Sequence, residues 1–216
     1  MHLFNLLDQY PKANRNLAAG YRTEENKRIA KQYGREFFDG DRVNGYGGYR
    51  YDGRWVAVAR RMKEAYRLTG ASSVLDVGCA KGFLLHDLRA EIPGIRVAGL
   101  DISRYALDNA MEDVRGQAVE GTCAALPFPD KSFDVVVAIN TIHNVAPRAC
   151  QESLREIMRV SRRHAFVQVD AWTNEREREN LFNWFLTAET LKSADDWAVC
   201  FKEAGYDGDY WWTVFP

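Results

Sequence analysis

Short apolar segments alternate with helical stretches through the middle of the chain. The five segments that we predict to be strands cover residues 74–79, 95–102, 117–122, 133–139 and 164–169. We expect a helix between each strand and the next, because near-continuous apolar strands joined by crossover helices are typical of a parallel sheet covered on both faces. The pattern predicts a doubly wound α/β fold with a mostly parallel sheet of six or seven strands.

Helical periodicity also precedes the first strand. Ile29, Tyr33 and Phe37 recur every fourth residue behind the capping residue Thr23, which predicts a helix over residues 24–38. A second apolar stripe predicts a helix from about residue 55, with Gly70 as its left-handed C-terminal cap.

The end of the chain offers fewer strands than the sheet needs. Ser193 begins a capping box before a last predicted helix that ends at Gly205, and residues 209–215 form one further predicted strand. Since only one strand fits after Gly205, we expect a six-stranded sheet or one completed by a partner chain. A homodimer is therefore an open expectation.

Length and charge limit the classes of protein. The 216 residues fit one domain, in which we expect N-terminal helices over 1–70, a ligand-binding core over 71–170, and an insertion with the last helix and strand over 171–216. The net charge of -1 disfavours a nucleic-acid partner. The start has no signal-peptide pattern and no segment suits a bilayer, so we expect a cytoplasmic protein without a membrane partner. The Cys and His spacing predicts no metal site.

A glycine-bearing turn follows the first predicted strand, at the edge of the sheet where doubly wound folds bind ligands. The glycines at its ends and a small residue between them let the backbone approach a ligand closely. A dinucleotide fingerprint would need Gly at positions 78, 80 and 83, but Ala80 and Phe83 stand there. The residues of this turn that we expect to contact a cofactor are Asp76, Gly78, Cys79, Ala80 and Gly82.

Asp101 and Ile102 end the second predicted strand. An acidic side chain at this position can accept hydrogen bonds from both hydroxyls of a ribose, each contributing about 1.5–3 kcal/mol. Because a carboxylate here also serves NAD, Asp101 does not choose between cofactors.

The segment 121–134 separates the two cofactor classes better than Asp101 does. Its Leu126-Pro127-Phe128 run and the Asp134 that opens the fourth strand are not shared by NAD enzymes. Together with the turn, this segment resembles the class I S-adenosylmethionine-dependent methyltransferases. The resemblance implies a Rossmann-like methyltransferase fold, S-adenosylmethionine as cofactor and S-adenosylhomocysteine as product. The family commonly has an Asp after Gly121, and this chain has Thr122.

The resemblance also suggests roles for three residues beyond the turn. Thr122 and the backbone of Cys123 would meet the edge of the adenine, and Asn140 would lie near the amino end of the cofactor. The resemblance covers about residues 70–170. It departs from the family at the C-terminus, where the usual antiparallel hairpin has no room.

His143 follows the fourth predicted strand and is our candidate general base, since imidazole titrates near neutral pH. The alternative is that His143 only shapes the pocket. A base is not essential, because alignment of acceptor, methyl group and sulfur contributes more to methyl transfer than proton removal does.

The stretch 39–54, rich in Gly and Asp, is too long for a simple connector. It can act as a lid in which Tyr46, Tyr49 and Arg54 contact the cofactor, with the arginine pairing with its carboxylate. The alternative is a rigid turn held by buried tyrosines.

Five of the six tryptophans lie in the last quarter of the chain and suggest a partly apolar or ring-shaped acceptor. We therefore expect methyl transfer to an oxygen or nitrogen of a small molecule. A nicotinamide-dependent oxidoreductase and a non-catalytic S-adenosylmethionine-binding protein remain as alternatives.

Overall fold

The computed structural model describes residues 1–11, 15 and 17–216 and confirms the doubly wound α/β fold. Seven strands form one continuous path, in which all neighbours are parallel. In spatial order they are β1 (His2–Leu3), β8 (Asp209–Thr213), β6 (Ser161–Trp172), β5 (Phe133–Ile139), β2 (Ser73–Val77), β3 (Arg96–Asp101) and β4 (Ala118–Glu120). An eighth, β7 (Lys192–Ser193), pairs with the end of β6.

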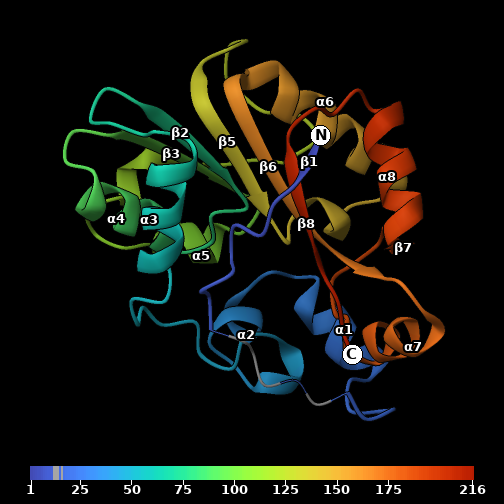
Figure 1. Ribbon diagram of the computed structural model, residues 1–216. Helices are drawn as coiled ribbons and strands as arrows, with labels where there is room; N and C mark the ends of the chain where they lie inside the picture. Colours follow the sequence, from blue (N-terminus) through green and yellow to red (C-terminus); the bar gives the residue numbers. More distant parts are fainter. Residues whose placement is uncertain (12–14, 16) are drawn as a thin grey trace.

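Helices cover both faces of the sheet (Figure 1). Helices α3 (Val56–Ala65), α4 (Phe83–Glu91) and α5 (Arg104–Asp108) pack on one face, and α6 (Pro147–Val160) and α8 (Ala194–Glu203) on the other. In β5, Val135 and Val137 belong to the hydrophobic core on the side of α3, α4 and α5, whereas Val136 and Ala138 belong to the core on the side of α6 and α8. From Val135 to Ala138 this strand is therefore apolar on both faces, as the sequence pattern predicts.

A third layer lies across the carboxyl ends of the strands, at the bottom of Figure 1. It consists of α1 (Glu24–Ala30), α2 (Arg35–Phe38), the 3-10 turn η1 (Arg42–Asn44) and α7 (Glu175–Trp184). We call this layer the cap. Two more 3-10 turns connect strands: η2 (Arg115–Gln117) leads into β4 and η3 (Ile142–Asn144) follows β5.

The helix predicted over residues 24–38 is broken in two. Thr23 caps α1 as expected, but Tyr33 is left-handed with φ 49° and Gly34 is extended. The carbonyl of Tyr33 accepts a hydrogen bond of 2.5 Å from the hydroxyl of Ser103, a contact with the core. This tertiary contact accompanies the break in a pattern that favoured one helix.

Two further local predictions are wrong. Helix α3 ends at Ala65, and Arg67, with φ 51°, takes the left-handed conformation expected at Gly70. Gly70 instead packs where a Cβ would lie 2.5 Å from the carbonyl oxygen of Pro93. Between β4 and β5 the described chain crosses without a helix, although one was expected there.

The sheet is completed by the chain's own N-terminus. A single strand, β8, follows Gly205 as predicted, and it runs parallel to β6. Its outer neighbour is β1, held by a hydrogen bond of 3.0 Å from the Phe4 amide to the Tyr210 carbonyl. Within the described residues the sheet thus has eight strands rather than six or seven, and β1 occupies the edge beside β8.

The four cysteines, Cys79, Cys123, Cys150 and Cys200, are buried and free. Within the described ranges 1–11, 15 and 17–216, no helix has both the length and the apolar character needed to cross a bilayer.

Candidate functional site

A first cavity opens at the carboxyl ends of β2, β3 and β5, where the order of the strands reverses along the sheet. It encloses about 740 Å³ including its mouth. Eight residues chosen from the sequence line it: Tyr46, Gly78, Ala80, Asp101, Ile102, Thr122, Cys123 and Asn140. Aromatic side chains of the cap, among them Tyr33 and Phe38, complete the wall.

The turn after β2 brings backbone close to this cavity. Gly78 has φ 85° and a Cβ there would lie 2.1 Å from Oγ1 of Thr141, so no larger residue fits. Ala80, with φ 49°, is left-handed despite its Cβ, a conformation that costs on the order of 1–2 kcal/mol. Strain of this kind is concentrated at binding sites.

Asp101 holds the turn and still faces the cavity. Its two carboxylate oxygens accept hydrogen bonds from the amides of Ser103 at 2.8 Å and Ala80 at 2.7 Å. Burial raises the pKa of Asp101, although these amide hydrogen bonds oppose the shift. The carboxylate keeps lone pairs for hydroxyl donors, and the neighbouring Ile102 exposes 55% of its surface, which suits a flat apolar ligand.

Four of the predicted cofactor residues lie behind or beside this wall. Asp76 is buried, and its pKa rises to about 7 because of burial and then of the neighbouring Asp101 charge. Cys79 packs in the core between α4 and the sheet. Gly82 caps α4 with φ 73°, and Tyr49 stacks on Phe83 at 4.7 Å between ring centroids.

The structure does not bring Arg54 to the cavity. Its guanidinium forms an ion pair with Asp52, two residues away. Arg54 lines neither this cavity nor the neighbouring one. The expectation that Arg54 pairs with a cofactor carboxylate has no support from this position.

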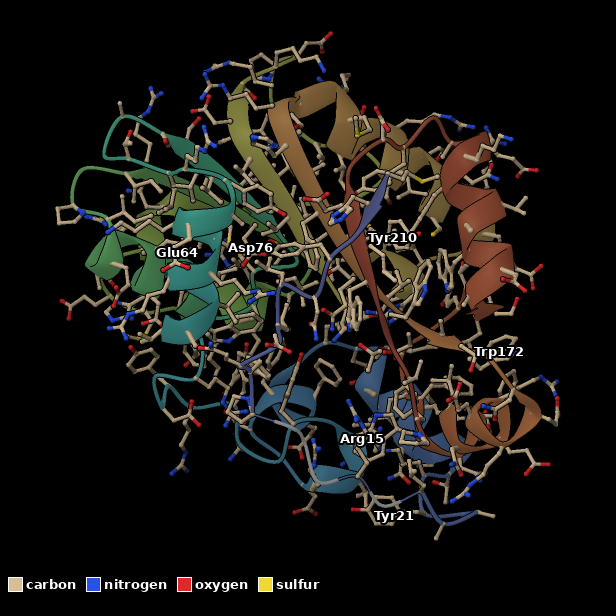
Figure 2. The ribbon with its side chains drawn as sticks, viewed as in Figure 1. Arg15, Tyr21, Glu64, Asp76, Trp172 and Tyr210 are labelled. Atoms are coloured by element: carbon tan, nitrogen blue, oxygen red, sulfur yellow. The ribbon has the colours of Figure 1, made fainter. Side chains whose placement is uncertain are left out.

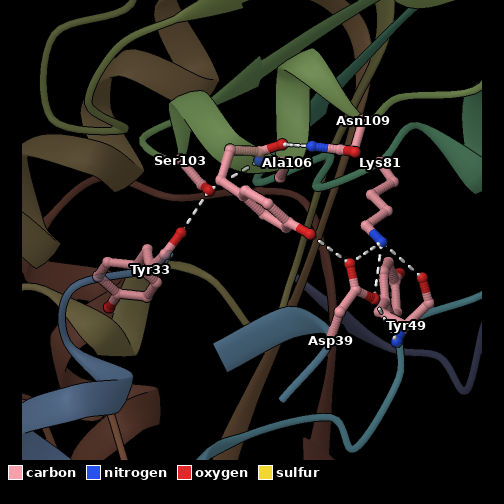
Figure 3. A network of polar contacts seen from close by, with 8 residues as sticks. Tyr33, Asp39, Tyr49, Lys81, Ser103, Ala106 and Asn109 are labelled. Atoms are coloured by element: carbon pink, nitrogen blue, oxygen red, sulfur yellow. Dashed lines mark hydrogen bonds and ion pairs between the residues drawn. The ribbon is translucent and has the colours of Figure 1, made fainter. Parts of the chain in front are cut away.

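The contacts of the stretch 39–54 favour the rigid turn over the lid. Lys81, in the glycine-bearing turn, donates to both carboxylate oxygens of Asp39, at 2.8 and 2.7 Å, and to the Tyr49 carbonyl at 3.0 Å (Figure 3). The hydroxyl of Tyr105 donates to the same carboxylate at 2.7 Å. Lys81 is only 7% exposed, and its ion pair with Asp39 ties the stretch to the turn.

A second cavity of about 690 Å³ adjoins the first. It lies between the strand ends and the cap, and its wall includes Arg15, Arg22, His143, Asp170 and Trp184. Figure 2 shows Asp76 among the strands and Arg15 in the region below them. The residues that line both cavities are Phe37, Tyr46, Asn140 and Asn144.

Asn140 stands where the two cavities meet. It is left-handed with φ 53°, which Asn tolerates better than most residues. Its amide donates to the Gln168 carbonyl at 2.9 Å, and its carbonyl accepts from the Asn144 side chain at 2.9 Å. The role near the amino end of the cofactor stays a prediction.

His143 lies in the second cavity and is 4% exposed. Its Nδ1 accepts a hydrogen bond of 3.2 Å from the Asp170 amide, so the neutral ring carries its proton on Nε2, which is 3.7 Å from the Asp170 carboxylate. Burial lowers the pKa of His143, although the charge of Asp170 opposes the shift. A neutral ring without a free lone pair favours a positioning role over the predicted general base.

Several residues of the second cavity were missed in the sequence. Asp170 directly follows the predicted strand 164–169, so its place at the carboxyl end of a parallel strand was available as a signal. Asn144 stands one residue after His143. Arg15, Arg22 and Arg42 had no such signal, because they come from the N-terminal quarter of the chain, far from the strand ends in sequence.

Comparisons with known proteins agree with this geometry. The family model described as a methyltransferase domain matches residues 74–164. The demethylmenaquinone methyltransferase of Symbiobacterium thermophilum is 28% identical over 197 residues, covering 85% of this chain and 76% of that protein. The mitochondrial arginine-hydroxylase NDUFAF5 of Rattus norvegicus is 35% identical over 81 residues, covering 36% of this chain and 23% of that protein.

A solved structure shows the same fold over most of the chain. It is that of an S-adenosylmethionine-dependent methyltransferase from Aquifex aeolicus, with a TM-score of 0.52 and 17% identity, covering 84% of this chain and 86% of the other. The chain spans between 23% and 55% of the length of three curated relatives that it matches. The family match over residues 74–164, the parallel sheet and the turn at its switch point make this chain similar to the class I S-adenosylmethionine-dependent methyltransferases.

Proposed function

We propose that this chain transfers a methyl group from S-adenosylmethionine in the first cavity to an oxygen or nitrogen of a small molecule in the second. The observation that carries the proposal is that the cavities share Phe37, Tyr46, Asn140 and Asn144. Ligands bound in the two cavities would meet at these residues, as methyl donor and acceptor must.

The residues of the first cavity suit this cofactor. The carboxylate of Asp101 can accept from ribose hydroxyls, and the exposed side chain of Ile102 offers an apolar surface to a base. Thr122 and the Cys123 backbone supply polar groups on the same wall. No residue with a Cβ, alanine included, could stand at Gly78, where the backbone must come close.

When bound, the cofactor would supply an electrophilic methyl group on a sulfonium. The main task of the protein is then to align the two ligands, and good alignment can lower a barrier by roughly 7–11 kcal/mol. Asn140 and Asn144, fixed to each other by the hydrogen bond between them, give the shared wall a defined geometry.

Asp170 is our candidate general base for the acceptor proton. Its side chain lines the second cavity and is 15% exposed, and burial raises its pKa, although electrostatic interactions with His143 and Arg15 oppose this shift. A raised pKa makes the carboxylate a stronger base. We assign His143 the role of a positioning residue, because its ring lies against both the amide and the carboxylate of Asp170.

Fold alone leaves the reaction open. The relatives and neighbours include proteins named an arginine-hydroxylase and a [4+2]-cyclase, the latter with a TM-score of 0.53 and 20% identity. A nicotinamide cofactor and a binding protein without catalysis therefore remain the rivals to test.

Calorimetric titrations with S-adenosylhomocysteine, S-adenosylmethionine and NAD test the proposal. We expect the first two to bind with one site per chain and NAD not to bind. A chain that binds neither sulfur compound would overturn the proposal. Methyl transfer from radiolabelled S-adenosylmethionine to a panel of hydroxyl and amine compounds then separates an enzyme from a non-catalytic binder.

A further inference from the structure

Three arginines of the N-terminal quarter enter the second cavity and lie against aromatic rings. The guanidinium carbon of Arg22 is 3.7 Å from the centre of the Trp184 ring, and that of Arg42 is 5.1 Å from the same ring. Arg15 lies 4.7 Å from the centre of the Phe215 ring. All three line the cavity.

None of the three has a carboxylate of the described residues within ion-pair distance. Among the residues that the structure describes, no carboxylate forms an ion pair with Arg15, Arg22 or Arg42. Their polar contacts are to carbonyl groups: Arg22 donates to Trp184, and Arg42 donates to Gly45 at 2.8 Å and to Tyr46 at 3.3 Å.

Arg22 is buried and carries an unpaired hydrogen-bond donor. The residue is 9% exposed, and its Nε is buried without a hydrogen-bond partner. Burial and then the nearby charge of Arg42 lower the pKa of Arg22 to about 10. A buried, unpaired donor on a cation costs free energy unless a ligand accepts its hydrogen bond.

The charge of the whole cavity wall also favours an anionic ligand. Asp170 is the one acidic residue among the described residues that line this cavity, and His143 is neutral. Three guanidiniums therefore face one carboxylate. Since like charges repel, the arrangement is stabilised by an anion that they share.

We propose that the acceptor carries an anionic oxygen group, a carboxylate or a phosphate, and that Arg22 and Arg42 bind it with help from Arg15. Guanidinium groups suit this role because their donors form a planar fork that matches both anions. This inference rests on the proposed function only in naming the ligand as the methyl acceptor. The anion site itself stands on the geometry of the arginines.

The test titrates the protein, saturated with S-adenosylhomocysteine, with three ring compounds: benzoate, phenyl phosphate and neutral benzamide. We expect at least one of the two anions to bind about 10-fold or more tightly than benzamide, because hydrogen bonds to charged groups contribute about 1.5–3 kcal/mol. A higher salt concentration should weaken the binding of the anions but not the binding of benzamide. A preference for benzoate or for phenyl phosphate identifies the class of anion, and either preference supports the proposal.

Variants locate the anion. Arg42→Gln and Arg22→Gln should each lower anion affinity about 10-fold, and Arg22→Lys should restore part of it. The matched control is Arg28→Gln, which removes an exposed arginine of α1 that pairs with Glu25 and should change nothing. Thermal unfolding and the affinity for S-adenosylhomocysteine show whether each variant is folded.

Two results would overturn the inference: anions that bind no better than benzamide, and anion binding that survives Arg22→Gln and Arg42→Gln in folded protein. Failure of the proposed function is distinguishable from both. A chain that does not bind S-adenosylhomocysteine but binds an anion through Arg22 and Arg42 keeps the anion site and loses only the methyl-transfer reaction.

Discussion

The two cavities share a wall but are built in opposite ways. The first consists mainly of turns at the ends of neighbouring strands, which bring residues between 78 and 145 together, and the cap only closes it. The second takes residues from both ends of the chain and from the region after β6, from Arg15 to Phe215. The first cavity therefore has a recognisable local sequence, whereas the second has none.

Their charges differ as well. The one charged side chain among the described residues of the first cavity is Asp101, whereas the second holds three arginines and Asp170. A ribose and a base require one carboxylate and apolar surface, as the first cavity offers. The contrast indicates that the second cavity is selective through charge.

The largest expected effect lies in the second cavity. Asp170→Asn should lower methyl-transfer turnover by about 10²–10⁴-fold, the usual contribution of a general base, and leave the affinity for S-adenosylhomocysteine unchanged. Steady-state rates and calorimetry measure the two quantities. The control is Asp195→Asn on the exposed start of α8. Turnover within a factor of about two of the wild type would remove Asp170 as the base.

In the first cavity the corresponding change is Asp101→Asn. We expect affinity for S-adenosylhomocysteine to fall by about 10- to 150-fold, because one charged hydrogen bond contributes about 1.5–3 kcal/mol. Benzoate and phenyl phosphate should bind the second cavity as before. Asp108→Asn, an exposed carboxylate of α5 that pairs with Arg104, is the control. Unchanged affinity for the cofactor product would contradict the assignment of this cavity.

Asp39→Asn tests the connection between the cap and the turn. Lys81 would lose the carboxylate whose two oxygens both accept hydrogen bonds from its ammonium group. We therefore expect the free energy of unfolding to fall by about 1–3 kcal/mol. Burial raises the pKa of Asp39, but hydrogen bonds from Lys81 and Tyr105 outweigh it and hold the pKa below the usual 3.8. The stabilisation is thus present above pH 3.8 and is lost as the pH falls through the lowered pKa.

Urea unfolding at two pH values measures this effect, with Asp41→Asn, an exposed neighbour, as the control. Equal stabilities of Asp39→Asn and wild type near neutral pH would show that the ion pair does not hold the cap.

The smallest effect concerns His143. Because burial lowers its pKa below 6.5, the folded state disfavours the protonated ring, and stability should fall as the pH drops below 6.5. His143→Gln cannot titrate and should lose less stability over that range, whereas the exposed control His2→Gln should follow the wild type. Parallel pH profiles of His143→Gln and wild type would contradict a buried neutral histidine.

Much of the fold followed from local pattern. The strand over Phe133–Ile139 and the caps at Thr23 and Ser193 were predicted where they occur, because period and capping depend on neighbouring residues. The glycine-bearing turn and Asp101 were found for the same reason. Parallel strands carry their ligand residues at one edge, so a short motif there specifies the first cavity.

Tertiary structure decided the remainder. The left-handed Tyr33 that breaks the first helix accompanies a contact with Ser103, and the place of β1 beside β8 depends on pairing across the whole chain. The hydrogen bond from the Asp170 amide shows that the Nδ1 lone pair of His143 is occupied. The arginines of the second cavity come together only when the cap folds over the strand ends, a long-range event that no local sequence period encodes.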